Sequence, residues 1–357
     1  METAIGVDLE ADSMFHYQEQ VCLIQISTQS RNILVNTLAL DDLTPLAPVF
    51  SDPEINKVFH GADYDIRSLF RDFNIEVKTL FDTQIAAKFL GIKSTGLANL
   101  LDNYFGIVLE KKYQKSDWSK RPISQAMLSY AIQDSCSLLS LAEILKKELE
   151  DNSRFLWVLE ECEILSKVRP APSTDDPLFL KFKGAGSLDG RSLAIIEEIL
   201  QLRENIACKR DCPPFKVLGN HSILRIAKQR LRTEKEFIEQ RVLSQKQIQS
   251  FGKLLVSKVS SALRYPEEEL PSFPRKPRPS RSPQVSVRIK ALRRWREDRA
   301  AELDIDPSSL LTNAQIYSLS EKKIFDEEEL SAIEGIRDWQ RRTFGHEICS
   351  LLMRIKN

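Results

Sequence analysis

The sequence predicts a chain of several domains, in which an α/β domain is followed by two small all-α blocks. Its 357 residues suffice for two or three domains of roughly 100–200 residues each. Short β-branched apolar runs alternate with amphipathic helical patterns over the first 150 residues. From residue 151 onward the apolar residues recur at helical spacing, without a convincing strand. A stretch with six prolines, 266–283, separates the two helical blocks.

The first 150 residues contain the signals expected of one mixed sheet with flanking helices. The β-branched apolar runs predict strands over 4–10, 21–27, 32–37 and 56–61. A short helix is expected near 43–52 and an amphipathic helix over 65–73, and strands and helices alternate to Asp82. The longest periodic stretch is 128–149, which predicts one helix of about six turns.

The helical blocks share one plan: a charged amphipathic helix, a Pro-containing turn, a short helix and further helices. We therefore interpret them as two copies of one small module. The predicted division is a first domain over 1–166, a connector over 167–190, helical domains over 191–265 and 284–357, and a Pro/Arg-rich linker over 266–283. Between residue 151 and the linker, helices are expected near 152–166, 191–208, 221–230, 234–240 and 245–264.

Composition excludes several classes of protein. Hydrophobic residues at 42% and charged residues at 29% are ordinary for globular chains and argue against general disorder. No run approaches the roughly 18 apolar residues of a membrane helix, and the first residues do not resemble a signal peptide. Six scattered cysteines are too few for a disulfide scaffold. We expect a reduced, cytoplasmic protein without a membrane partner.

The net charge of zero hides an asymmetry. Residues 1–150 carry 21 acidic and 14 basic side chains, whereas residues 151–357 carry 30 acidic and 37 basic ones. An acidic region tolerates a polyanion only if its carboxylates are neutralised, most simply by divalent cations, and a basic region attracts one. The asymmetry suggests a metal-using first half and a second half that holds nucleic acid.

Three segments carry the residues of a candidate site. Asp8 and Glu10 lie two apart on the first strand, so both project from one face. Asp63 and Asp65 follow at a strand-to-helix junction, where an aspartate is also common as a helix cap. Tyr130 and Asp134 are four apart, which places them one turn apart on one helical face.

Each segment alone has a simpler interpretation: a solvated acidic strand, a helix cap, or a surface pair. Together, four carboxylates and a tyrosine match a two-metal phosphodiesterase site, in which the cations activate water and stabilise the leaving oxygen. Oxygen ligands favour Mg²⁺ or Mn²⁺ over zinc. The four histidines are scattered, which argues against a zinc hydrolase.

The ordered segments VDLE, HGADYD and YAIQD resemble the three motifs of the DEDD 3′–5′ exonucleases, in the subclass with a tyrosine in the third motif. The segments FDTQIAAKFLG, GLANLLDNYFGI and QKSDWSKRP, which lie between the second and third motifs, are similar to those of the ribonuclease D family, and so are KFKGAGSLDGRSL and GIRDWQRRTFG further along the chain. The resemblance covers nearly the whole chain and implies a ribonuclease H-like exonuclease domain. Family members usually carry a helix and lead-in residues ahead of the first motif, whereas here Met1 lies only seven residues ahead of Asp8.

The resemblance implies roles for single residues. Asp8, Glu10, Asp65 and Asp134 correspond to the ligands of two metal ions, and Tyr130 to the residue that positions the attacking water. The family pattern of HGA, two variable residues and Asp selects Asp65 over Asp63. The implied reaction is attack by a metal-activated hydroxide on the last phosphodiester of a free RNA 3′ end, which releases a 5′-mononucleotide.

The loop QKSDWSKRP is a candidate for contacts with the substrate. Gln114, Lys115, Trp118 and Arg121 combine polar, cationic and aromatic groups, which suit phosphate contact and base stacking. The alternative is that Trp118 packs beneath the loop while the cations are solvated.

The two helical blocks resemble HRDC domains, most clearly over 212–230, which implies auxiliary binding of RNA. Residues 271–300 hold ten Arg or Lys against two acidic residues, as expected for phosphate contacts without sequence preference. The family substrate implied is precursor tRNA, and no protein partner is evident. The alternatives are a single-stranded DNA 3′–5′ exonuclease with the same ligands, and an RNA-binding protein with a degenerate nuclease fold.

Overall fold

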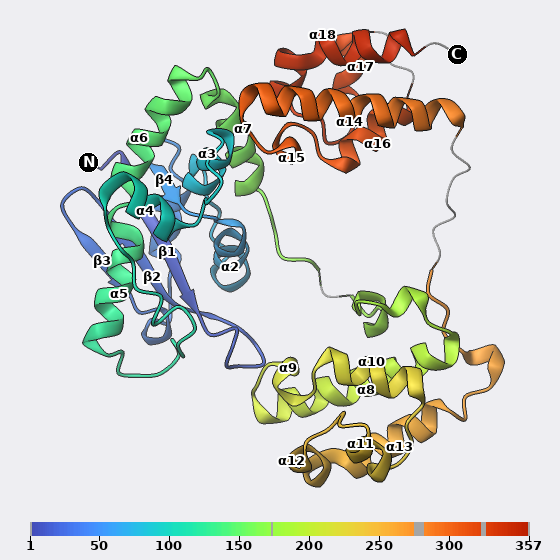
Figure 1. Cartoon of the computed structure of the whole chain (residues 1–357). Coiled ribbons are helices and arrows are strands. Elements are labelled where there is room, and N and C mark those ends of the chain that lie inside the picture. The colour runs from blue at the N-terminus through green and yellow to red at the C-terminus, as the bar shows by residue number, and fades with distance from the viewer. Residues whose placement is uncertain (1, 173, 275–281, 323–325, 356–357) are drawn as a thin grey trace. The chain divides into compact units, whose positions relative to one another are not determined.

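The computed structural model in Figure 1 describes residues 2–172, 174–274, 282–322 and 326–355. A five-stranded sheet is formed by β1 (Ala4–Ala11), β2 (Val21–Ser27), β3 (Asn32–Val35), β4 (Asn56–Phe59) and β5 (Leu80–Asp82). The strand order is β3-β2-β1-β4-β5, with antiparallel pairing from β1 to β3 and parallel pairing of β1, β4 and β5. The predicted mixed sheet is confirmed.

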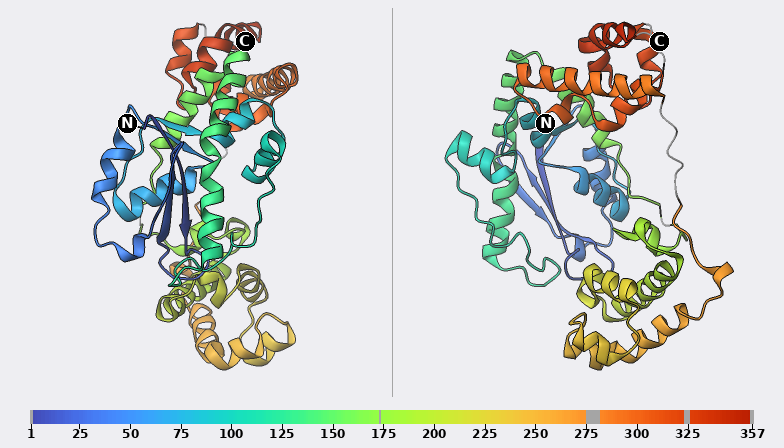
Figure 2. Two further views of the ribbon diagram at one scale, coloured as in Figure 1. Left: turned by 90° about the vertical axis from the view of Figure 1, so that its left-hand side faces the viewer. Right: turned by 45° about the vertical axis from the view of Figure 1, so that its right-hand side comes forward.

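Helices cover both faces of this sheet (Figures 1 and 2). They are η1 (Thr37–Ala39), η2 (Thr44–Leu46), α1 (Ala47–Ser51), α2 (Asp63–Phe73), α3 (Thr83–Phe89), α4 (Leu97–Phe105), α5 (Gln125–Cys136), α6 (Leu138–Asp151) and α7 (Phe155–Ser166). The helices α5 and α6 pack on β1. They approach so closely that a Cβ atom on Gly6 would lie 2.9 Å from the carbonyl oxygen of Ser135. Glycine at position 6 therefore permits this close packing.

The prediction of one helix over 128–149 is wrong. Two helices, α5 and α6, meet at Ser137. The residues at the junction are short and polar, which makes them weak helix formers. The hydroxyl of Ser135 is bonded to that of Ser27 in β2 at 2.7 Å, which ties the end of α5 to the sheet.

Beyond residue 166, the regular secondary structure of the described residues consists of helices joined by turns and loops. The first block contains η3 (Leu178–Lys181), η4 (Ala185–Ser187), α8 (Gly190–Arg210), α9 (Pro214–Val217), α10 (Asn220–Gln229), α11 (Glu234–Glu239), α12 (Gln245–Gln247), the π-helical turn η5 (Ile248–Gly252), α13 (Lys253–Ala262) and η6 (Glu267–Glu269). The second contains α14 (Pro283–Leu303), α15 (Pro307–Leu310), α16 (Asn313–Glu321), α17 (Glu327–Ser331) and α18 (Asp338–Arg354). Among the described helices, none combines the length and the apolar character needed to cross a membrane.

The chain forms two compact units. One contains residues 1–11, 21–170 and 278–357, so the second helical block packs with the α/β domain. The other contains residues 12–20 together with the first helical block, 171–277. Part of the predicted linker, 275–281, lies outside the described residues. The domain boundaries derived from the sequence stay predictions.

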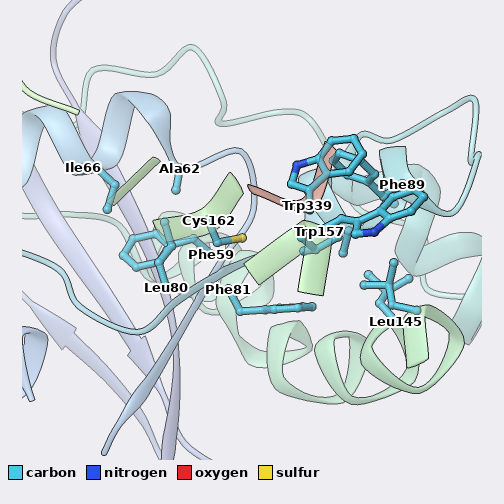
Figure 3. Packing of buried hydrophobic residues seen from close by; sticks show 14 of the residues in the cluster. Phe59, Ala62, Ile66, Leu80, Phe81, Phe89, Leu145, Trp157, Cys162 and Trp339 are labelled. Atoms are coloured by element: carbon cyan, nitrogen blue, oxygen red, sulfur yellow. The ribbon is translucent and has the colours of Figure 1, made fainter. Parts of the chain in front are cut away.

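Aromatic rings join the second helical block to the α/β domain (Figure 3). Trp339 of α18 stacks on Trp157 of α7, with ring centroids 4.7 Å apart, and lies edge-on to Phe89 of α3 at 5.5 Å. Beside them, the guanidinium of Arg154 donates to the carbonyl oxygens of Phe89 and Leu303, each at 2.8 Å. The second helical block therefore contacts both α3 and α7 in this one region.

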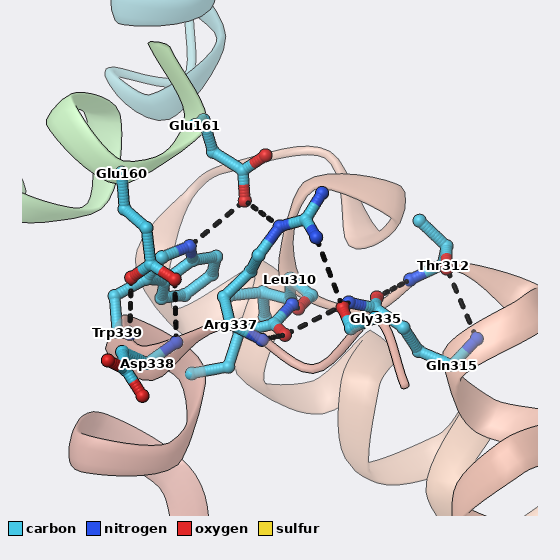
Figure 4. A network of polar contacts seen from close by, with 10 residues as sticks. Glu160, Glu161, Leu310, Thr312, Gln315, Gly335, Arg337, Asp338 and Trp339 are labelled. Carbon is cyan, nitrogen blue, oxygen red and sulfur yellow. Dashed lines mark hydrogen bonds and ion pairs between the residues drawn. The ribbon is translucent and has the colours of Figure 1, made fainter. Parts of the chain in front are cut away.

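Two adjacent glutamates of α7 add polar contacts to the same region (Figure 4). Glu160 accepts from the backbone N–H groups of Asp338 and Trp339, at 2.7 and 2.8 Å, and so supplies an anion to the start of α18. Glu161 accepts from the Arg337 guanidinium and from the Trp339 indole N–H, both at 3.0 Å. These directional hydrogen bonds fix the orientation of α18 on α7, in addition to the burial of the Trp339 ring.

We expect Trp339→Ala to destabilise the whole unit that contains the α/β domain, because Trp339 is only 3% exposed and fills space between α3 and α7. Loss of a buried tryptophan costs about 3–5 kcal/mol. Differential scanning calorimetry should show a lower unfolding temperature for the transition of that unit.

Leu156→Ala provides the matched control. Leu156 lies on α7 beside Trp157 but is 69% exposed, so its truncation should leave the unfolding temperature nearly unchanged. Equal unfolding temperatures for Trp339→Ala and the unaltered protein would show that the aromatic contact does not stabilise the unit.

Candidate active site

Two carboxylates project from β1 near its C-terminal end. Asp8 and Glu10 occupy alternate positions of the strand and therefore share a face, which is the face covered by α5. Asp134 of α5 completes a group in which one carboxylate oxygen from each residue lies within 4.8 Å of the others. A strand and a helix that are far apart in sequence thus bring three acids together.

Asp65 stands in the first turn of α2, which follows β4. Because β1 and β4 are parallel neighbours, their C-terminal ends lie at the same edge of the sheet. Asp65 is 8% exposed and close enough that its charge raises the pKa of Asp8. Asp63 instead is exposed and pairs with Arg67 at 2.8 Å. Of the two aspartates in the second motif, Asp65 is the buried one whose charge reaches Asp8, although its oxygens lie outside the group formed by Asp8, Glu10 and Asp134.

A buried carboxylate, Asp82, holds the loop that leads to Asp65. Its oxygens accept from the backbone N–H groups of Gly61 and Ala62, at 3.0 and 2.8 Å. The same carboxylate caps α3 by accepting from the N–H groups of Gln84 and Ile85, at 2.7 and 3.2 Å. One side chain therefore fixes the start of two helices, and Gly61 adopts the positive φ of +72° that the turn requires.

The third motif lies on α5. Tyr130 lies one turn from Asp134, with which its hydroxyl interacts electrostatically, and only 8% of its surface is exposed. Its ring packs edge-on against Tyr113 at 5.8 Å and obliquely against Trp118 at 6.2 Å. Burial, followed by the charges of Asp134 and Glu10, raises the pKa of Tyr130, so the phenol is neutral at pH 7.

The crowding of these acids shifts their protonation. Burial, followed by the charge of Asp8, raises the pKa of Glu10 to about 10. Burial and the charge of Asp82 raise the pKa of Asp65 to about 7, and burial raises that of Asp134 to about 6. The pKa of Asp8 is also well above its usual value, first through burial and then through Asp65 and Asp134. All four acids therefore resist ionisation in the absence of a cation.

An open pocket of about 410 Å³ contains this acidic group. Asp8, Glu10, Tyr130 and Asp134 line one side of it. The start of α4 and the loop that follows α4 also line the pocket, through Gly96, Leu97, Ala98, Asn99, Leu109, Glu110, Lys111 and Gln114. The carboxylates are therefore accessible to a ligand.

The four loop residues expected to contact substrate occupy different environments. Gln114 lines the pocket, and Lys115 is exposed outside its lining. Trp118 is 1% exposed and packs in a cluster with Leu23 and Tyr130, so its indole is not available for stacking on a base. This placement corrects the expectation for Trp118 in favour of the alternative, packing beneath the loop.

Arg121 makes structural contacts, but the residue is also exposed, so its expected substrate contact stays a prediction. Its guanidinium donates to the carbonyl oxygens of Trp118 and Cys22, at 2.7 and 2.9 Å, and to the side-chain oxygen of Asn36. These bonds tie the loop to β2. By bonding to the carbonyl oxygen of Trp118, the Arg121 guanidinium stabilises the loop that packs against Tyr130.

Some residues of the pocket were not assigned by the sequence analysis. The start of α4 lies within GLANLLDNYFGI, a segment that resembled the family without any role being given to it. Gln84 and His60 also border the pocket. His60 contacts the hydroxyl of Thr83 at 2.9 Å, through Nδ1. These residues stand next to recognised motifs in the sequence, and this position could have drawn attention to them. Spacing along the chain does not show, however, which side chains border the carboxylates.

The donor set fits divalent cations. Only carboxylate oxygens converge in this group, and hard cations such as Mg²⁺ and Mn²⁺ prefer oxygen ligands. Adjacent buried carboxylates repel one another, and a bound cation removes this cost.

Comparison with known proteins agrees with this geometry. Residues 1–150 match the family model described as a 3′-5′ exonuclease, and residues 192–259 and 286–352 each match the HRDC domain. The chain is 29% identical to ribonuclease D of Gluconacetobacter diazotrophicus over 357 residues, which cover 98% of this chain and 88% of that protein.

Two solved structures are similar. The catalytic core of RRP6 from Trypanosoma brucei shares 34% identity, with a TM-score of 0.63 over 73% of this chain and 74% of that one. Escherichia coli RNase D, described as an exoribonuclease involved in structured RNA processing, shares 25% identity, with a TM-score of 0.71 over 100% and 94% of the two chains. The chain belongs to the ribonuclease D family of 3′–5′ exoribonucleases.

Proposed function

We propose that the pocket removes nucleotides one at a time from RNA 3′ ends, using two divalent cations held by Asp8, Glu10, Asp65 and Asp134. The observation that carries the proposal is the convergence of carboxylate oxygens from Asp8, Glu10 and Asp134 within 4.8 Å in an accessible pocket. Mg²⁺ or Mn²⁺ bound there would lower the pKa of water and offset negative charge on the phosphate.

Tyr130 orients the attacking water. Its hydroxyl is engaged with Asp134, and because its pKa is raised the phenol keeps its proton at pH 7. The proton is donated to the carboxylate, so the lone pairs of the phenol oxygen remain to accept a hydrogen bond from water. Tyr130 is therefore a positioning group and not a general base.

The substrate follows from the family. RNA with a free 3′ end is the ligand, and we assign precursor tRNA as its main source and 5′-mononucleotides as the products. Structured RNA is named for the similar Escherichia coli enzyme. The helical blocks would add phosphate contacts without sequence preference. We place the reaction in the cytoplasm, in keeping with six cysteines that form no disulfide in the structure.

Matched 5′-labelled RNA and DNA oligonucleotides, with Mg²⁺, Mn²⁺ or EDTA, test this function. The proposal expects a metal-dependent ladder that shortens RNA from its 3′ end, with DNA much less degraded. Equal digestion of DNA would favour a general 3′–5′ exonuclease. Binding of RNA without hydrolysis in any metal would favour a degenerate nuclease.

Asp65→Asn and Asp63→Asn form a matched pair for the same assay. Asp65→Asn should lower hydrolysis by at least about a hundredfold while RNA binding persists, because it removes a ligand charge. Asp63→Asn should retain activity, since Asp63 pairs with Arg67 at the surface. Loss of activity in both variants, or in neither, would contradict the choice of Asp65.

In EDTA, stability should fall as pH rises from about 4 to about 7. The folded-state pKa values are raised, to about 6 for Asp134 and about 7 for Asp65, from a usual value of 3.8. The folded protein therefore keeps protons that the unfolded chain has released, so deprotonation across this range costs folding free energy. Thermal unfolding at pH 5 and pH 7.5 measures the effect.

Asp134→Asn, which cannot ionise at this position, should show a weaker dependence on pH in the same measurement. Added Mg²⁺ should raise the unfolding temperature of the unaltered protein most at the higher pH. An identical pH dependence in both proteins would exclude Asp134 as a contributor.

A further inference from the structure

Gln25 is a polar residue in an apolar position beside the acidic group. It lies in the middle of β2 and is fully buried, at 0% exposure. Neither its side-chain oxygen nor its side-chain nitrogen has a hydrogen-bond partner among the described residues. Removing an amide from water without replacing its hydrogen bonds is costly, so this residue calls for a physical reason.

The register of the sheet places Gln25 directly opposite Asp8. The two residues are paired across the antiparallel strands β1 and β2, and residues paired in this way project from the same face. Their Cβ atoms are then roughly 4.5–5.5 Å apart, within the reach of a glutamine side chain to a neighbouring carboxylate. Gln25 therefore shares the face that carries Asp8 and Glu10.

The surroundings of Gln25 are fixed on both sides along β2. Ser27, two residues further, is bonded to Ser135 of α5 at 2.7 Å. Leu23, two residues before, packs with Tyr130 and Ala131 of the same helix. The side chain of Gln25 lies between these contacts and under α5, the helix that also carries Asp134. Solvent is excluded there, so nearby protein groups are the natural partners for its amide.

We propose that Gln25 is a positioning residue: its amide N–H group, which has no partner among the described residues of this structure, donates to the carboxylate of Asp8 when a cation is bound and holds that carboxylate in the orientation that binds the cation. This inference rests on the proposed function, because it assumes that Asp8 is a metal ligand. An amide suits the task, since it donates without adding charge to a site that already contains four acids. Groups behind metal ligands commonly orient them in this way.

Gln25→Met is the most direct test, because methionine keeps the length of the side chain and removes the donor. Calorimetric titration with Mn²⁺ alone, in the absence of RNA, should show affinity weakened by about 10–100-fold. The unfolding temperature in EDTA should stay the same or rise, because the variant no longer buries an unpaired amide. Gln25→Leu should behave similarly and serves if Gln25→Met does not fold.

Ser27→Ala is the matched control. It alters the same strand and the same face, and it removes the bond to Ser135. We expect it to lower the unfolding temperature and to leave Mn²⁺ affinity within about twofold, since neither Ser27 nor Ser135 is a candidate ligand and the Ser27–Ser135 bond does not involve the carboxylates. A loss of Mn²⁺ affinity in Ser27→Ala equal to that in Gln25→Met would point to general loosening of the strand and would overturn the proposal.

The remaining outcomes separate this inference from the proposed function. If the unaltered protein degrades RNA and binds Mn²⁺, and Gln25→Met binds Mn²⁺ equally well, the positioning role fails and the function stands. A lower unfolding temperature for Gln25→Met with unchanged Mn²⁺ affinity would make Gln25 a structural residue only. Absence of Mn²⁺ binding by the unaltered protein would instead reject the metal site itself.

Discussion

The burial of four carboxyl groups near one edge of the sheet, strengthened by repulsion of Asp8 and Glu10 by their acidic neighbours, is the constraint on which the rest of the structure depends. Burial raises the pKa of Glu10 to about 10 and that of Asp65 to about 7, so the folded chain holds these acids together against their tendency to ionise. Such an arrangement lowers the free energy of unfolding unless a bound cation offsets the unfavourable electrostatics. The parts of the fold that surround the acids are therefore best understood as the framework that keeps them in place.

That framework is built from connections between distant segments. Asp82 fixes the loop before Asp65 and the start of α3. Its own backbone N–H donates to the sulfur of Cys162, on α7, at 3.2 Å. Trp339 packs against the far end of α3 and against α7, so the second HRDC domain supports the same two helices from outside. This domain is thus an integral part of the unit that contains the candidate active site, whatever contacts it makes with RNA.

Features could be predicted from the sequence where one short segment contains both the periodic spacing and the functional side chains. The alternation of Asp8 and Glu10, the four-residue spacing of Tyr130 and Asp134, and the sheet itself could be predicted from local periodicity. The environment of Trp118 could not, because a tryptophan between two lysines suits stacking on a base as well as packing in a core. The break at Ser137 was also missed, because the apolar periodicity continues across the short polar residues at the junction, and the bond of Ser135 to Ser27 in β2 is visible only in the fold. Gln25 was overlooked because its importance depends on strand register, which composition does not show.

Crystals soaked in Mn²⁺ would test the central claim most directly, through anomalous scattering that locates each bound ion. The account predicts two sites, coordinated by oxygens of Asp8, Glu10, Asp65 and Asp134 and roughly 3.5–4 Å apart, as in two-metal hydrolases. Asp8→Ala crystals should lose at least one of them. A map without Mn²⁺ at these carboxylates, from a protein that still degrades RNA in the same buffer, would contradict the account.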